Sequence, residues 1–178
     1  MNPVLYRKEI MLIDGRRLTV KEAEETEANE LIRFISIVGC ESKFLTYDPD
    51  EYKIRNIDEK KFIRSFRKSD NQAILIGRVQ NEIVGHLVFR SGILQRVRHI
   101  GEAGISVSKK NWGIGIGTLM MNALLDWAKK SKVIRKVKLR VRSDNNRAIA
   151  VYKKVGFIEE RSITWFFFDN LVMGRSLN

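Results

Sequence analysis

Three glycines at alternate positions, Gly113, Gly115 and Gly117, could form part of an anion-binding site. The apolar residues that follow recur at helical spacing, which predicts a helix starting near Gly117. Upstream, Ile105 and Val107 alternate with serines, which predicts a strand. Glycines let the backbone come close to a ligand, and the free N–H groups of a first helical turn attract negative charge. The sequence therefore predicts a site for a phosphate or pyrophosphate group.

The two common nucleotide-binding motifs do not match this turn. A P-loop ends in Gly-Lys-Ser/Thr, whereas Thr118 follows Gly117 directly. A dinucleotide fold needs G-x-G-x-x-G and an acidic residue at the end of the next strand. Here the pattern is G-x-G-x-G, and the next strand ends in Arg140 and Arg142. Two interpretations remain at this point, namely a different phosphate ligand or a glycine-rich turn without a ligand.

The elements that position the turn follow from periodicity. Helices are predicted over Glu22–Val38, ended by Gly39, over Glu59–Lys68, capped by Asp58, and over Ala148–Val155, closed by Gly156. Strands are predicted over Arg16–Val20, Gln72–Val79, Glu82–Ser91, His99–Ser108, Lys136–Arg142, Phe157–Trp165 and Phe166–Val172, with a hairpin turn at Gln80-Asn81. Residues 1–15 are predicted to be a lead-in with a turn at Asp14-Gly15. The chain, residues 1–178, is thus predicted to be one α+β domain, an α/β sandwich with a mixed, largely antiparallel sheet of about seven strands and helices on both faces.

Composition excludes several classes of protein. The 178 residues, 44% of them apolar, suffice for one real core, and no run of 18 apolar residues predicts a membrane span. The N-terminus lacks the features of a signal peptide, and the single cysteine, Cys40, cannot form an internal disulfide, so a cytoplasmic protein is expected. With 2 histidines and 1 cysteine, no metal site of usual ligand spacing can be assembled.

The net charge of +12 is unevenly distributed along the chain. Residues Glu22–Glu59 contain 11 acidic and 4 basic residues, whereas Lys129–Arg161 contains 12 basic and 3 acidic residues. This asymmetry suits a protein that holds a polyanion on one side and receives a cation on the other, although solvated helix faces would give similar counts. Because exposed aromatic residues do not interleave with the basic ones, single-stranded nucleic acid is not the expected partner.

A second motif follows in the stretch Asn145–Phe157, NNRAIAVYKKVGF. Its pattern Asn-x-x-Ala-x-x-x-Tyr-x-x-x-Gly-Phe comes after a strand, a glycine turn and a helix in that order. The combination resembles the GNAT superfamily of acetyl-CoA-dependent N-acetyltransferases. The resemblance covers the chain from Arg16 to Met173.

The resemblance implies a sheet splayed between its fourth and fifth strands, which are His99–Ser108 and Lys136–Arg142. Backbone groups of Ile105 and Val107 would pair with the pantetheine arm of acetyl-CoA. The backbone amides that would hold its pyrophosphate are those of Trp112, Gly113, Ile114, Gly115, Ile116, Gly117 and Thr118. Lys154 is a candidate for the other phosphate of the cofactor, and Asn145 is a further cofactor-binding residue. The family usually has Gln or Arg where this chain has Trp112, so one side-chain contact with phosphate is missing.

The resemblance also implies roles in catalysis. Tyr152 matches the tyrosine that acts as general acid toward the departing thiolate, and it also lies within the cofactor site. Glu102 is the candidate base, and His99, at the start of the same strand, is another candidate. Backbone N–H groups around Ile105–Val107 could stabilise the oxyanion. His86 lies in an apolar strand and is interpreted as a core residue.

The expected function is therefore transfer of an acetyl group from acetyl-CoA to a primary amine of a small molecule, protein or peptide, by direct attack through a tetrahedral intermediate. Acidic residues in the segment that walls the acceptor side in this family predict a cationic amine: Glu41, Asp48, Asp50 and Glu51. A homodimer is compatible with the family, and no metal is expected. The alternative is a non-catalytic module of similar fold that binds coenzyme A or nucleic acid.

Overall fold

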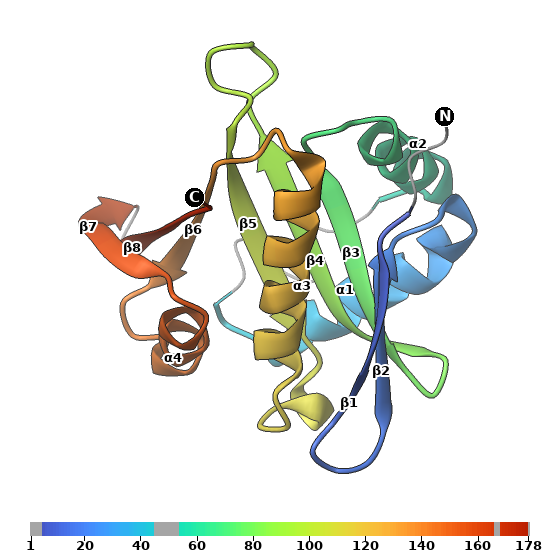
Figure 1. The fold of residues 1–178 in the computed structure, drawn as a ribbon. Helices are drawn as coiled ribbons and strands as arrows, with labels where there is room; N and C mark the ends of the chain where they lie inside the picture. The colour runs from blue at the N-terminus through green and yellow to red at the C-terminus, as the bar shows by residue number, and fades with distance from the viewer. Residues whose placement is uncertain (1–4, 45–53, 166–167, 178) are drawn as a thin grey trace.

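An eight-stranded sheet runs through the computed structural model, which describes residues 5–44, 54–165 and 168–177 (Figure 1). The strands are β1 (Arg7–Met11), β2 (Arg17–Glu22), β3 (Ala73–Val79), β4 (Glu82–Ser91), β5 (Ile100–Val107), β6 (Lys136–Arg142), β7 (Ile158–Trp165) and β8 (Phe168–Ser176). The helices are η1 (Glu25–Glu27), α1 (Ala28–Glu41), α2 (Asn56–Arg67), η2 (Lys109–Asn111), α3 (Ile116–Ser131) and α4 (Asn146–Lys154), where η marks a 3-10 helix. The strand order is β1-β2-β3-β4-β5-β6-β8-β7.

The sheet is antiparallel except where β5 meets β6. These two strands pair in parallel over three positions, from Ile100 opposite Lys136 to Glu102 opposite Lys138. Beyond Glu102 no further pairs form between them, and the strands diverge (Figure 1). This is the place where the sequence predicts the splay.

Two apolar layers hold the helices on opposite faces of the sheet. On one face α3 and α4 bury residues such as Met120 and Leu124 against Leu87 of β4. On the other face α1 and α2 pack residues such as Ile63 against Ile76 of β3. Each of these side chains is fully buried, and burial of one such side chain contributes about 1.5–3 kcal/mol.

Glycines in two neighbouring strands let α3 approach the sheet closely. A Cβ atom on Gly85 would lie 2.2 Å from the Sδ atom of Met120, and one on Gly77 would lie 3.0 Å from the same atom. The helix that carries the glycine turn at its N-terminus is therefore seated directly on β3 and β4.

The predicted hairpin at Gln80-Asn81 is confirmed. These residues connect β3 to β4 with φ angles of 49° and 66°. Two successive positive φ angles in a two-residue loop match the twist of the strands on either side of it.

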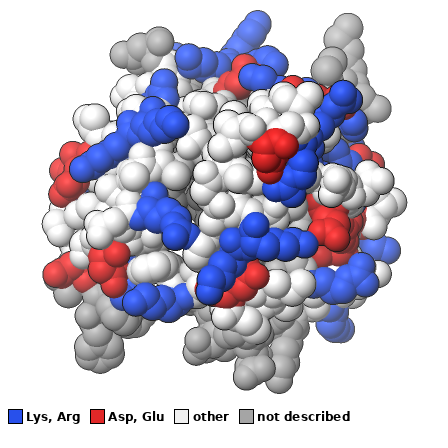
Figure 2. Space-filling view, turned by 90° about the horizontal axis from the view of Figure 1, so that it is seen from below, with Lys and Arg blue, Asp and Glu red and all other residues white. Residues whose placement is uncertain are grey.

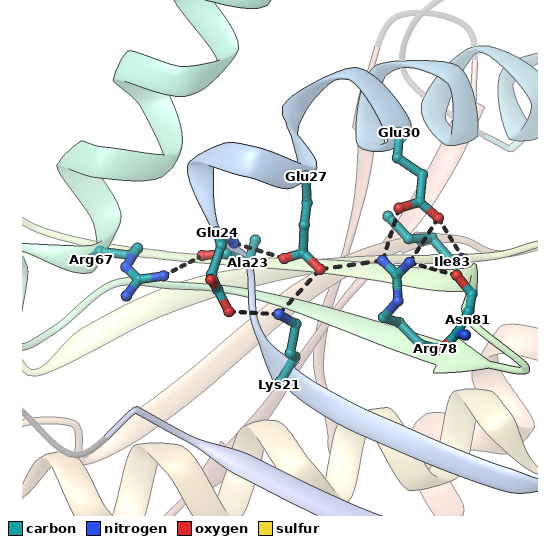
Figure 3. A network of polar contacts seen from close by, with 9 residues as sticks. All are labelled: Lys21, Ala23, Glu24, Glu27, Glu30, Arg67, Arg78, Asn81 and Ile83. Carbon is teal, nitrogen blue, oxygen red and sulfur yellow. Dashed lines mark hydrogen bonds and ion pairs between the residues drawn. The ribbon is translucent and has the colours of Figure 1, made fainter.

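A polar network joins the start of the first helical segment to the sheet (Figure 3). Arg78 of β3 forms ion pairs with Glu27 at 3.2 Å and with Glu30 at 2.9 Å. Lys21 of β2 forms ion pairs with Glu24 at 2.7 Å and with Glu27 at 3.1 Å. Much of the acidic charge of this segment is therefore neutralised locally, away from β5 and β6.

The N-terminal residues form a strand that the sequence did not predict. Within the lead-in of residues 1–15, β1 pairs with β2 and places Ile10 opposite Leu18. Four of its five residues are exposed and Ile10 is only half-buried, so no apolar alternation marks the strand. As a result the sheet has eight strands, and the diverging pair is fifth and sixth.

Both predicted boundaries of the first helix were wrong. Glu22 still belongs to β2, a 3-10 turn follows, and α1 begins only at Ala28. The helix also continues through Gly39 to Glu41, because Gly39 is buried within it and Ser42, in an extended conformation, is the C-cap.

The predicted cap of the second helix was also wrong. Arg55 is the N-cap of α2, and Asp58 lies within the first turn. The Asp58 carboxylate accepts a hydrogen bond from Nε of Arg55 at 2.7 Å instead of capping the helix. Among the described residues, no helix is long and apolar enough to cross a membrane.

Candidate functional site

The glycine turn, residues 112–117, presents a row of backbone N–H groups at the N-terminus of α3. Gly113 and Gly115 have φ angles of 83° and 90°, which favour glycine. From Gly113 to Thr118, no backbone N–H donates to a backbone oxygen of the described residues, and the first helical bond runs from Leu119 N–H to the Gly115 oxygen at 3.0 Å. Successive free N–H groups at a helix N-terminus are well suited to bind a phosphate or pyrophosphate.

Two of the glycines leave room for such a ligand. A Cβ atom on Gly113 or Gly115 would meet no described atom within 4 Å. A Cβ on Gly117 would lie 3.8 Å from Val151 of α4, an ordinary contact. The open side of the turn is thus at Gly113 and Gly115, whereas Gly117 packs toward α4.

Buried polar residues anchor the segment that enters the turn. Ser108 and Asn111 are both buried, and Nδ2 of Asn111 donates to Oγ of Ser108 at 2.9 Å. Nε1 of Trp112 donates to the carbonyl oxygen of Val107 at 2.7 Å. These bonds fix the direction in which the chain leaves β5, and they hold the N–H groups in place before a ligand arrives.

Arg147 supplies a cation at the position where Trp112 lacks one. Its guanidinium carbon lies 4.2 Å from the centroid of the Trp112 ring. Sequence reasoning missed this pairing, because the two residues lie on different elements. Figure 2 views this end of the molecule and shows many Lys and Arg side chains with fewer acidic ones. A basic surface beside the free N–H groups favours a polyphosphate ligand.

The diverging residues of β5 and β6, 103–107 and 139–142, are called the fork. The side chains on its α3 and α4 side are apolar: Ala103, Ile105, Val107, Leu139 and Val141. The alternate residues face α1 and α2 and are polar or small: Gly104, Ser106, Arg140 and Arg142. A ligand that passes through the fork would move from an apolar side to a polar side, past unpaired strand backbone.

Tyr152 lies on the apolar side, in α4. Only 7% of its surface is exposed, and its ring centroid is 6.2 Å from that of Phe157. Burial raises the pKa of Tyr152 to about 12. Burial thus keeps the phenol in its protonated form.

Glu102 lies at the closed end of the fork, on the polar side. Its carboxylate is exposed and accepts a hydrogen bond from Nε of Arg140 at 2.7 Å. His99 lies just before β5, three residues further than Glu102 from the open part of the fork. Of the two candidate bases, Glu102 is therefore the better placed.

His86 differs from an ordinary core histidine. Its Nε2 atom is buried and has no hydrogen-bond partner among the described residues. Burial, together with the positive charge of Arg90, lowers the pKa of His86 to about 4. His86 is opposite Ser106 in the β4–β5 ladder, so a neutral imidazole lies beside the polar side of the fork.

Two predicted ligands occupy the ends of α4. Asn145 is the N-cap, and its Oδ1 accepts a hydrogen bond from the Ala148 N–H at 3.2 Å. Lys154 is the exposed last residue of the helix. Within the turn, Ile114 and Thr118 are partly buried and Ile116 is buried, so their backbone N–H groups are better placed to meet a ligand than their side chains are.

Comparison with known proteins identifies the family. The model of the Acetyltransferase (GNAT) family matches residues 31–157, which is more than half of the chain. The acetyltransferase of GNAT family from Streptococcus pneumoniae is 31% identical with a TM-score of 0.87, over 90% of this chain and 99% of that one. The chain therefore belongs to the GNAT acetyltransferase family and is an acyltransferase.

One further structure shares the fold, and one curated relative matches about half of the chain. The structure of yncA from Salmonella typhimurium, determined with acetyl-CoA, has a TM-score of 0.77 at 14% identity, over 90% of this chain and 94% of that one. The L-amino acid N-acetyltransferase AaaT of Escherichia coli (strain K12) is 29% identical over 83 residues. That match spans 47% of this chain and 51% of the curated relative, about half of each.

Proposed function

We propose that the protein transfers an acetyl group from acetyl-CoA to the primary amine of a small molecule, protein or peptide. The observation that carries the proposal is the run of free N–H groups from Gly113 to Thr118, located where β5 and β6 diverge. Family membership supports acetyl transfer in general, and the E. coli relative is named for L-amino acids. A non-catalytic module is not favoured, because the chain belongs to a family of acetyltransferases.

Two parts of the chain support the binding of acetyl-CoA. The free N–H groups of the glycine turn suit the pyrophosphate, and the Arg147 guanidinium over Trp112 adds positive charge beside them. Ile105 and Val107 do not pair with β6, so their backbone groups suit the amide groups of pantetheine, which would extend the strand ladder. The Val107 carbonyl oxygen already accepts a hydrogen bond from Nε1 of Trp112, so at Val107 the N–H is the group available for this pairing. Lys154 and Asn145 stay predictions as ligands.

The reaction needs three events at the fork. The amine nitrogen bonds to the thioester carbonyl carbon, and the carbonyl π electrons move to oxygen, where a backbone N–H near Ile105 would stabilise the negative charge. The oxygen electrons then re-form the carbonyl, the C–S bond breaks, and the thiolate takes the phenol proton of Tyr152. The amine nitrogen loses a proton to a base, which passes it to solvent, and Tyr152 regains one proton from solvent, so that the amine proton is in effect transferred to the departing thiol.

Glu102 stays the predicted base. One of its oxygens is held by Arg140 at 2.7 Å, so it would receive the proton on its remaining oxygen or through water. A neutral His86 beside Ser106 is the second group able to accept a hydrogen bond on this side of the fork.

Substitution of Tyr152 with phenylalanine tests the proposed acid. We expect Tyr152→Phe to lower kcat about 10²- to 10⁴-fold, with the affinity for acetyl-CoA unchanged. Thiol release from acetyl-CoA with a panel of primary amines measures the rate, and calorimetric titration measures binding. The matched control is Tyr6→Phe, which removes a hydroxyl that donates to Asp126 at 3.0 Å on the outer side of α3.

Unchanged turnover in Tyr152→Phe would remove this residue from proton transfer. Saturable binding of acetyl-CoA without thiol release for any amine would instead favour the non-catalytic alternative. Equal loss of activity in both variants would indicate a structural effect of removing a buried hydroxyl.

A further inference from the structure

We propose that the acceptor is an amine that also carries a carboxylate group, and that Arg90 and Lys138 bind this carboxylate. The proposal rests on the proposed N-acetyltransferase function and names the chemical class of its acceptor. It concerns the polar side of the sheet at the closed end of the fork, the side that α1 and α2 cover.

The two cations lie in one row across three strands. Arg90 of β4 is directly opposite Glu102 of β5, which is directly opposite Lys138 of β6. Residues directly opposite each other in a ladder place their side chains on the same face of the sheet. Arg90 and Lys138 therefore flank Glu102 on the polar side.

The carboxylate of Glu102 forms its ion pair with Arg140 at 2.7 Å and not with either neighbour in the row. Among the described residues, no carboxylate forms an ion pair with Arg90 or Lys138. The other two cations of β6 have carboxylate partners, since Lys136 pairs with Glu160 and Arg142 pairs with Asp144. The described part of this face thus carries an excess of positive charge at the row.

The guanidinium of Arg90 is held by two aromatic rings. Its carbon lies 5.1 Å from the ring centroid of Phe62 and 5.9 Å from that of Phe66, both on α2. Stacking on aromatic faces leaves the edge of a guanidinium free for a planar anion, and a carboxylate matches that edge with two parallel hydrogen bonds. Arg90 is exposed, so a ligand can reach it.

Beside the row, the described residues leave the surface over Gly104 uncovered. A Cβ atom on Gly104, two residues beyond Glu102 on the same face, would meet no described atom within 4 Å. Two strand residues span about 7 Å, a distance that an arginine or lysine side chain can bridge. An amine placed over Gly104 would lie next to the open fork, where the thioester is expected, with its carboxylate directed to the row.

This inference differs from the cationic acceptor that the acidic segment predicts. Of the residues behind that prediction, Asp48, Asp50 and Glu51 lie outside the described residues. Glu41 accepts a hydrogen bond from the Lys109 N–H at 2.7 Å. The two acceptor classes can be separated with matched compounds.

The experiment compares glycine and the L-amino acids that have a primary amine, each with its own amide, as acceptors, by thiol release from acetyl-CoA. The amide keeps the amine and the side chain and removes only the negative charge. We expect kcat/KM for the best free acid to exceed that of its amide about 10- to 150-fold, the factor for losing a charged hydrogen bond. Arg90→Gln and Lys138→Gln should each remove most of this difference, because they raise KM for the acid and leave kcat/KM for the amide unchanged.

Arg7→Gln on the exposed edge strand β1 is the matched control, and it should leave kcat/KM unchanged for both the acid and the amide. An amide that is used as well as its acid, or better, would overturn the carboxylate inference while the N-acetyltransferase function stands. The absence of thiol release with every acid and amide would overturn the carboxylate inference. If acetyl-CoA also failed to bind in calorimetric titration, the proposed function itself would be overturned. An acid preference that survives in both Gln variants would overturn the assignment of Arg90 and Lys138.

Discussion

Replacement of Gly115 by alanine separates the conformational role of the glycine turn from its role in binding. Gly115 is the N-cap of α3 with φ of 90°, and a Cβ there would point into space that no described atom occupies within 4 Å. Gly15, in the turn between β1 and β2, has nearly the same backbone, with φ of 82°, and is equally open. The two substitutions therefore impose the same kind of strain, but only one of them adds a methyl group at the predicted phosphate site.

The expected magnitudes follow from this comparison. A left-handed conformation costs a residue with a Cβ about 1–2 kcal/mol, so both variants should unfold about 2–8 °C below the parent. If the methyl group displaces one charge-assisted hydrogen bond between a turn N–H and the pyrophosphate, binding weakens by about 1.5–3 kcal/mol. For Gly115→Ala this corresponds to a dissociation constant for acetyl-CoA raised about 10- to 150-fold, and for Gly15→Ala to no change.

Calorimetric titration with acetyl-CoA, beside thermal unfolding of each variant, measures both quantities. If Gly115→Ala bound acetyl-CoA as tightly as the parent, the glycine turn would not be the phosphate site. If both variants lost affinity equally, the effect would come from general destabilisation. Only a loss confined to Gly115→Ala agrees with the geometry.

Two further predictions concern stability. Gly101→Ala should destabilise the fold by about 1–3 kcal/mol in urea unfolding, because its Cβ would lie 2.3 Å from Cζ of Phe89 and 2.6 Å from the Arg90 carbonyl oxygen. Gly104→Ala is the control and should not destabilise the fold, because its Cβ would meet no described atom within 4 Å. The lowered pKa of His86, about 4 against 6.5, means that the unfolded chain binds a proton that the native protein excludes, so stability is fully present above pH 6.5 and falls toward pH 4. Relative to His86→Gln, the parent should lose about 2–3 kcal/mol between pH 7 and 4.5, and parallel pH profiles of the two proteins would contradict this.

Local pattern was enough to predict the elements whose one face is buried. Six of the seven predicted strands, and the hairpin at Gln80-Asn81, agree with the structure to within two residues. In β6 and the later part of β4, buried positions alternate with less buried ones, and β3 is buried at all but one position. The seventh, Phe166–Val172, begins near β8 but stops short of its end at Ser176. β1 was missed because four of its five residues are exposed, so that only its pairing with β2 defines it.

The predicted helix boundaries were wrong where contacts with neighbouring residues outweigh the local preference of a residue type. Asp58 is a good N-cap residue by type, yet the nearby Arg55 side chain takes its carboxylate. Glycine often ends a helix, but Gly39 is buried within α1, and the helix continues to Glu41. In both cases a neighbour that the periodicity does not report decides the outcome.

The candidate site also contains features that the sequence predicts and features that it does not. The glycine turn could be predicted because positive φ angles and a helix N-terminus are encoded within a few residues. The contact of Arg147 with Trp112 and the buried pair Ser108 and Asn111 depend on how the elements pack, so the sequence alone did not predict them. The row of Arg90, Glu102 and Lys138 depends on the register of three strands and could not be read from any one segment.

The fork also has a consequence for the behaviour of the protein in a crowded solution. Unpaired strand backbone is a template on which another chain can add, and proteins normally cover it. Here the fork is closed at one end by the pairs that finish at Glu102 and Lys138, so a foreign strand could enter only a few residues deep. A bound cosubstrate would cover the same backbone, and at a hundred times its dissociation constant it would add about 2.7 kcal/mol to folding stability. The substrate of the reaction would then also protect the enzyme from self-association.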